Sequence, residues 1–265
     1  MTVAAVTNRS SLAVTFAVIR ALVLREAVNR LFVTRTAWAW VFCEPLLHML
    51  YLTALYSTVR VRKVGEIDTP IWVMVGLIGY FLFRKTGDQT AKAATENSAL
   101  FAYRQVKPID TLIARALLEA FNAIITMILA FVVFALANHP LLIEDPLEFM
   151  LALVGMWLLG MGYGLLTSSV FELVDELRLV MRVLMKPMYL VSGVILPMTS
   201  LPTEWRQVLM WNPVAQGLEL ARMAISSNYH PAPETDAAYF FKFILCMIAL
   251  GLYLHRRFAS KIAAR

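Results

Sequence analysis

The sequence predicts an all-α membrane protein that crosses the bilayer as six helices. Two observations lead to this class. Sixty per cent of the 265 residues are apolar and the mean hydropathy is +0.67, whereas soluble domains are about 45–50% apolar. The apolar residues also form runs close to the roughly 20 residues that a helix needs to cross the hydrocarbon core. A soluble bundle would need a polar face on nearly every helix, which these runs do not provide, so the pattern argues against a soluble protein.

The predicted spans follow the apolar runs in chain order. No tandem repeat or low-complexity linker separates them, so residues 1–265 are predicted to form a single transmembrane domain. The fifth run is the least regular. The six spans cover residues 36–59, 70–89, 112–137, 147–170, 184–200 and 238–256.

Basic residues predict the orientation of these spans, because Lys and Arg near span ends are retained on the cytoplasmic side. With the N-terminus inside, 18 of the 24 basic residues fall in cytoplasmic segments and six in exterior ones. The basic pI of 9.4 is therefore explained by the excess of Lys and Arg in the predicted cytoplasmic segments. The charges are spread over several loops, which does not fit a nucleic-acid-binding face. We predict that both termini are cytoplasmic.

Residues 11–35 are predicted to form an amphipathic helix along the bilayer surface. Arg20, Arg25 and Arg30 recur among Leu, Val, Ile and Phe in this segment. The alternative is a poorly inserted additional span, but each arginine at the bilayer centre costs about 2.5–3.5 kcal/mol. In a surface helix, these arginines would face anionic head groups and the apolar side would face the acyl chains.

Two spans carry polar stripes on one helical face. At 100° per residue, the stripe of the first span falls within about 80° of arc and that of the third within about 60°. Carboxylates at this depth should face protein or water. Glu44 and Glu119 are therefore predicted to form hydrogen bonds between helices or to line a pore, with proton coupling as a third alternative. The stripes comprise Trp40, Glu44, His48, Tyr51 and Thr58, and Arg115, Glu119, Asn122 and Thr126.

The fourth span contains the sequence GMGYG at residues 160–164. Gly160 and Gly164 have a small-xxx-small spacing that lets a neighbouring backbone approach closely. We interpret this motif as a helix-packing site.

Prolines divide the segment before the last span. Pro197, Pro202 and Pro213 interrupt any single helix there, and the apolar run before Pro197 is too short to cross the membrane cleanly. Irregular backbone at membrane depth is tolerated only where it is buried or lines a cavity. We therefore predict a short fifth span followed by a re-entrant hairpin on the outer side, at residues 201–226.

The sequence contains no recognised catalytic or metal-binding motif. No GxxxxGK[ST] phosphate loop occurs, and the four histidines show no HExxH or other ligand spacing. No catalytic residue and no metal ligand is predicted, and the chain should not hydrolyse ATP by itself. Glu44 and His48, one helical turn apart, are the basis for an alternative interpretation as an intramembrane enzyme.

The region from 192 to 222 carries the most specific pattern. It contains the stretches SGVILPMTSLPTEW and WNPVAQGLELAR, which include Asn212, Pro213 and Arg222. Together with six spans and an amphipathic entry helix, these stretches resemble the membrane subunit of ABC-2 type exporters, with the type V exporter fold, and in particular the capsule polysaccharide export permeases of Gram-negative bacteria. Val214 and Gln216 depart from the general ABC-2 signature.

The resemblance implies a permease subunit in the bacterial inner membrane that translocates lipid-linked capsular polysaccharide. It implies that the chain itself binds no cofactor, and that ATP and Mg are bound by a separate ATPase. The implied partners are a second copy of the chain, two ATPase subunits, a periplasmic co-polymerase, an outer-membrane polysaccharide exporter and membrane lipids. An ABC-2 exporter of another cargo, such as O-antigen, teichoic acid or a drug, is the alternative.

The resemblance also implies a coupling helix between spans 2 and 3 that docks into the ATPase. An aromatic residue beside cations suits a partially acidic cleft, and Pro108 would end the helix while Asp110 caps the next. The alternative is a basic loop that binds anionic lipid. The predicted coupling residues are Tyr103, Arg104, Lys107 and Pro108.

Six spans are too few to enclose a wide conduit, so two copies are expected to share a pore on the two-fold axis. Aromatic rings would offer sugars a stacking surface without trapping them. The arginines at positions 20, 25 and 30 are expected to meet the acidic polymer where it enters. The predicted pathway residues are Trp40, Glu44, Tyr51, Tyr56, Tyr80, Phe83 and Tyr189.

Overall fold

The computed structural model describes residues 11–32, 35–58, 63–103, 105–139, 141–174 and 176–258. Within these ranges the chain is almost entirely helical. The strands found there are β1 (Lys63–Val64) and β2 (Ile67–Asp68), which pair antiparallel in one short hairpin. The predicted all-α class is confirmed.

Four helices in the described part of the chain are long and apolar enough to cross a membrane. They match the first, third, fourth and sixth predicted spans. A proline in the first turn begins α4 and α5, where its missing N–H costs no hydrogen bond. The four helices are α2 (Ala37–Thr58), α4 (Pro108–Leu136), α5 (Pro146–Leu173) and α9 (Ala237–Arg257).

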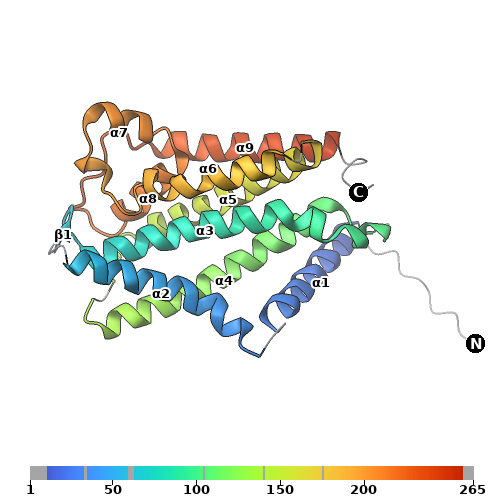
Figure 1. Cartoon of the computed structure of the whole chain (residues 1–265), viewed down its shortest axis with the longest axis horizontal. Coiled ribbons are helices and arrows are strands. Elements are labelled where there is room, and N and C mark those ends of the chain that lie inside the picture. The colour runs from blue at the N-terminus through green and yellow to red at the C-terminus, as the bar shows by residue number, and fades with distance from the viewer. Residues whose placement is uncertain are drawn as a thin grey trace, which may run out of the picture.

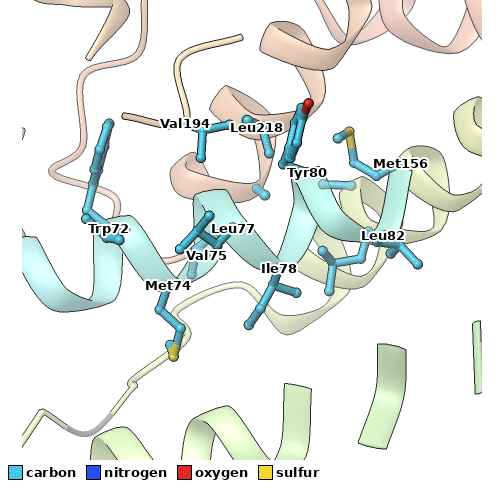
Figure 2. Close-up of a cluster of buried hydrophobic side chains, with 14 of the residues drawn as sticks. Trp72, Met74, Val75, Leu77, Ile78, Tyr80, Leu82, Met156, Val194 and Leu218 are labelled. Atoms are coloured by element: carbon cyan, nitrogen blue, oxygen red, sulfur yellow. The ribbon is translucent and has the colours of Figure 1, made fainter. Parts of the chain in front are cut away.

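The predicted second span lies in α3 (Thr69–Glu96), the central helix of the fold. At 1.5 Å per residue, α3 is about 42 Å long. Its first half is apolar and packs against α2, α4, α5 and α8, and Figure 2 shows Tyr80 of this half beside Leu218 of α8. Its second half carries Arg84, Lys85, Asp88, Lys92 and Glu96, so α3 is not among the four strongly apolar helices.

The predicted fifth span, 184–200, differs from the helix that the structure contains. Helix α6 covers Leu177–Val191, so it begins and ends earlier than expected. The chain leaves the helical conformation at Gly193, whose φ of 74° is in the left-handed region. A 3₁₀ turn, η2 (Met198–Ser200), follows Pro197.

The predicted hairpin segment 201–226 forms two short helices, α7 (Thr203–Leu209) and α8 (Pro213–Met223). Asn212 begins α8, because its side-chain oxygen accepts a hydrogen bond from the N–H of Val214 at 3.0 Å. Helix α8 is buried against α3, α5 and α9, whereas Trp205 of α7 and Trp211 of the turn are exposed.

The N-terminal helix α1 (Ser11–Leu31) lies at an angle to the other long helices (Figure 1). It packs against α4 and is not among the four strongly apolar helices. In Figure 1, α1 and the C-terminal end of α9 lie toward one end of the bundle, and the β-hairpin and α7 lie at the other. The 3₁₀ helix η1 (Ser98–Ala102), between α3 and α4, lies at the same end as α1.

Small residues let α3 and α5 approach closely. A Cβ atom at Gly160 would lie 2.5 Å from the carbonyl oxygen of Phe83, and one at Gly164 would lie 2.4 Å from Cβ of Thr90. Both distances are shorter than van der Waals contact. The interpretation of the GMGYG motif as a helix-packing site is confirmed.

The substitution Gly160→Val is expected to push α3 away from α5. The nearest atom is backbone and has little room to move, so we expect a loss of about 1–3 kcal/mol in the free energy of unfolding and a lower Tm in detergent. Gly162→Val is the matched control, because its Cβ would lie 3.2 Å from the side chain of Ile248, a tight contact but longer than the 2.5 Å contact at Gly160, so the Tm should fall less. Equal Tm values for Gly160→Val and the wild type would contradict the prediction.

Candidate functional site

Aromatic side chains from α2, α3, α5 and α6 form a continuous row. The rings of Tyr80 and Tyr189 meet edge to face, with 5.1 Å between centroids. Tyr80 also neighbours Phe83 at 6.5 Å, and Phe83 neighbours Tyr163 at 5.9 Å. At the other side, His48 Nε2 lies 2.9 Å from the Tyr189 hydroxyl. The structure thus brings together three of the predicted pathway residues.

Tyr56 lies farther along α2, toward the β-hairpin. Its hydroxyl donates a hydrogen bond to the carbonyl oxygen of Ile195, and its ring neighbours that of Trp72 at 6.5 Å. Tyr56 and Tyr189 therefore fasten α2 and the segment from α6 to η2 to one another. The described aromatic row is closed in this structure, since Tyr80 is fully buried and Phe83 is 3% exposed.

Trp40, Glu44 and Tyr51 do not join this row. They lie on the exposed side of α2, where Trp40 is 67% and Tyr51 is 64% exposed. The carboxylate of Glu44 lies 3.9 Å from Lys85 Nζ. The two residues that carried the enzyme interpretation, Glu44 and His48, thus have different partners.

Helix α1 is fixed to the bundle by a network of charged groups that centres on Glu26. This carboxylate lies 3.2 Å from Arg115 of α4 and accepts a hydrogen bond from the amide of Asn97 at 3.0 Å. Arg115 also pairs with Glu96 at 2.6 Å. Burial acts to raise the pKa of Glu26, but the Asn97 hydrogen bond and the Arg115 charge outweigh it and hold the pKa below its usual value.

Arg25 and Arg30 belong to the same network. Arg25 donates to the side-chain oxygen of Asn97, and Arg30 donates to Glu119 and, at 2.8 Å, to Gln89. Arg25 and Arg30 therefore contact other protein groups, although they were predicted to face lipid head groups. Arg20 is exposed. Glu119 pairs with Arg30 rather than with Arg115 of its own helix, so the interhelical role that we predicted as one alternative is present.

Sequence reasoning missed the role of Glu26. The signal was a single acidic residue within an otherwise basic amphipathic segment. A single glutamate in such a segment is normally assigned to the solvent-exposed charged face. The partners of Glu26, Asn97 and Arg115, are more than 70 residues away in sequence, so the sequence does not indicate the contact.

Removing Arg30 should loosen α1. The substitution Arg30→Ala leaves Glu119 buried, at 6% exposure, without its ion-pair partner. We expect the free energy of unfolding to fall by about 1–3 kcal/mol. The measurements are a lower Tm and faster protease cleavage in the segment that joins α1 to α2. Arg20→Ala, on the exposed side of the same helix, should change neither. A Tm unaffected by Arg30→Ala would refute the anchoring role of this arginine.

The segment between α3 and α4 contains the predicted coupling residues, and two of them are exposed. Tyr103 follows η1 directly and is 67% exposed, and Lys107 is also exposed. Pro108 begins α4 and, contrary to the prediction, does not end the preceding helix, because η1 already stops at Ala102. The Asp110 carboxylate accepts a hydrogen bond from the backbone N–H of Lys107 at 3.0 Å, so the predicted cap is confirmed. Arg104 lies outside the described residues.

The segment from 212 to 232 contains a buried ion pair. Arg222 is fully buried; it lies 3.2 Å from Glu219 and its guanidinium lies 3.7 Å above the ring of Trp72. The Glu219 carboxylate also accepts hydrogen bonds from the Tyr229 hydroxyl and from the N–H of Ala232, each at 3.1 Å. Burial raises the pKa of Tyr229 to about 12, so this hydroxyl stays protonated and donates. The cluster fastens α8 to α3.

The described residues contain no group of three or more His, Cys, Asp and Glu side chains that could hold a metal. The fold and these sites define a helical membrane protein with an N-terminal helix fixed to the bundle by charged groups, a buried aromatic row and an exposed segment between α3 and α4. The chain belongs to the ABC-2 type transporter family, whose model matches residues 17–225. The resemblance predicted from the sequence is confirmed.

Similar proteins extend over nearly the whole chain. The polysialic acid transport protein KpsM of Escherichia coli is 32% identical over 248 residues, covering 94% of this chain and 96% of KpsM. BexB of Haemophilus influenzae is 24% identical, with 97% and 96% covered, and CtrC of Neisseria meningitidis serogroup A is 26% identical, with 92% of each chain covered. Both are named capsule polysaccharide export inner-membrane proteins.

Proposed function

We propose that this chain is the membrane subunit of an ATP-driven exporter that moves lipid-linked capsular polysaccharide across a bacterial inner membrane. The observation that carries this proposal is the 32% identity, over nearly the full length of both chains, to a polysialic acid transport protein. The sequence has no phosphate loop of its own, so ATP and Mg are assigned to a separate ATPase.

We propose six crossings, in which α3 and α6 join the four strongly apolar helices. Support comes from the arrangement of the elements, because α1, η1 and the C-terminal end of α9 lie at one end of the bundle (Figure 1). The segments predicted to be cytoplasmic, which include these elements, hold most of the basic residues of the sequence. This end would be cytoplasmic under the positive-inside rule, with both termini inside. The buried α8 and the exposed tryptophans near α7 suit a re-entrant hairpin on the outer side.

The working assembly would be a homodimer with two ATPase subunits, joined to a periplasmic co-polymerase and an outer-membrane exporter. Exposed apolar residues on α6, including Leu179, Val183 and Leu184, support a second copy or lipid against this helix. ATP binding would draw the two coupling segments together and move α2 and α6 away from α3. Tyr80 and Phe83, now covered, would then become accessible to a passing sugar chain.

A deletion and complementation experiment tests the proposal. Cells that lack the chain should accumulate an acidic lipid-linked polysaccharide in the cytoplasm and lose it from the surface, and a plasmid copy should restore the surface polymer. The purified chain should carry with it an ATPase and a periplasmic partner. Accumulation of O-antigen or teichoic acid instead would assign another cargo, and normal surface polymer without the chain would contradict export altogether.

A further inference from the structure

A charged groove lies between α3 and α6, and Glu96, which pairs with Arg115, joins its edge to the network that fixes α1. Its volume is about 490 Å³. On α3, Arg84, Asp88 and Lys92 recur every four residues, so they form one stripe along the helix. On α6, Arg178 and Arg182 form the facing stripe. All five residues line the groove.

The groove carries a positive excess. Its lining has four cationic residues, at positions 84, 92, 178 and 182, and two acidic ones, Asp88 and Glu96, which gives a net charge of +2 at neutral pH. Both acids already have partners, because Asp88 lies 3.7 Å from Arg84 and Glu96 lies 2.6 Å from Arg115.

Lys92 and Arg182 are the cations that remain available. Neither has a carboxylate within 4.0 Å anywhere in the part of the chain that the structure describes. Both are exposed, and both line the same groove as Asp88. An incoming anion would meet these two side chains without breaking an existing ion pair.

The two stripes continue into the aromatic row. Tyr80 precedes Arg84 by four residues on α3, and Tyr189 follows Arg182 by seven on α6, so each stripe carries cations at one end and a tyrosine at the other. The rings of Tyr80 and Tyr189 touch, and Tyr163 belongs to both the groove lining and the row. A ligand with negative groups and apolar sugar faces matches this order.

We propose that the groove between α3 and α6 binds the carboxylate or phosphate groups of the acidic polysaccharide chain before its sugars reach the aromatic row. This inference rests on the proposed function and deepens it by locating the entry site. It moves that site from α1, where Arg25 and Arg30 are held in internal contacts, to Lys92 and Arg182. Exposed cations bind oxyanions weakly and reversibly, which suits a chain that must move on.

The first test compares two charge-removing variants in cells. Lys92→Gln combined with Arg182→Gln should lower surface export of the acidic polymer about tenfold, because two charge-assisted contacts are lost. The matched control is Lys186→Gln, which removes a charge one turn farther along α6, outside the groove lining. Co-purification of the ATPase and the elution profile of the complex should be the same for both variants. Unchanged export by the double variant would overturn the inference.

The second test separates the polymer from membrane lipid as the source of the anion. The purified complex is placed in nanodiscs of phosphatidylcholine alone, and its binding of a soluble oligomer of sialic acid is measured. Binding by the wild type and the Lys186→Gln variant, with about tenfold weaker binding by the double variant, supports the inference. Retention of phosphatidylglycerol is measured in parallel, in nanodiscs that contain this lipid. Oligomer binding that is absent in the wild type, or a double-variant defect that appears only as lost retention of phosphatidylglycerol, would overturn the inference.

The two proposals fail in distinguishable ways. If deletion of the chain leaves the acidic polymer at the cell surface, the proposed function fails. If deletion removes the polymer but the double variant exports it normally, export stands and only the groove assignment fails.

Discussion

The substitution Arg222→Leu is expected to destabilise the protein by about 3–5 kcal/mol, the cost of leaving a buried charge without its partner. Glu219 is 1% exposed, and its carboxylate would keep hydrogen bonds from Tyr229 and Ala232 but lose its countercharge. The contact of the guanidinium with Trp72 would also be lost. We expect little folded protein at 37 °C and a Tm in detergent lower by many degrees.

Two further variants separate lost charge from lost volume. Glu219→Gln combined with Arg222→Met removes both charges, so it should recover part of the stability that Arg222→Leu loses. Arg206→Ala, which breaks the partly exposed pair with Glu234 at 2.9 Å, should have a smaller effect than Arg222→Leu. Equal Tm values for Arg206→Ala and Arg222→Leu would contradict the importance of the buried cluster.

The double substitution Tyr103→Ala and Arg104→Glu is expected to abolish export and association with the ATPase together. Tyr103 is exposed at the end of η1 and outside the hydrophobic core, so its loss should leave the Tm unchanged. An exposed aromatic residue beside cations is typical of an interface anchor, whose truncation commonly costs 2 kcal/mol or more, roughly 30-fold in affinity. The measurement is co-purification of the ATPase, with surface polymer measured in parallel.

Gln105→Ala is the matched control, because Gln105 is exposed in the same segment and has no aromatic ring or charge. It should keep both the ATPase and export. Intact co-purification by the Tyr103 and Arg104 variant would refute the coupling role. If that variant still co-purified with the ATPase but no longer bound anionic vesicles, the result would support the alternative, in which this segment is a basic loop that binds anionic lipid.

Much of the helical architecture was predictable because it depends on local composition. The first, third, fourth and sixth spans each follow from an apolar run that is bounded by proline, polar or charged residues. The predicted fifth span lies too far along the chain. Apolar residues continue almost to Pro197, but the backbone of the protein already turns at Gly193. That turn is stabilised by contacts with distant segments, such as the hydrogen bond from Asn212 to Ser192 at 2.9 Å.

The candidate site was predictable only in part. Helical periodicity shows which residues share a face, but it does not show whether that face points to protein, lipid or water. Trp40 and Tyr51 were therefore grouped with Tyr80 and Tyr189, although the structure leaves the first two exposed and brings the last two into contact. The groove between α3 and α6 was missed for the same reason, because its cations belong to two segments that are about 90 residues apart.

The sequence by itself determined the membrane class, the apolar helices, the packing glycines and the family, because each depends on hydrophobic length, on spacing within one segment or on a contiguous motif. Only the tertiary structure decided the partners of the charged residues. Arg25 and Arg30 enter internal contacts, Arg222 is buried with Glu219, and Lys92 and Arg182 are left facing a groove. The physical reason is that a charge is stabilised by whatever lies within a few ångströms of it in space, and folding brings those neighbours from distant parts of the chain.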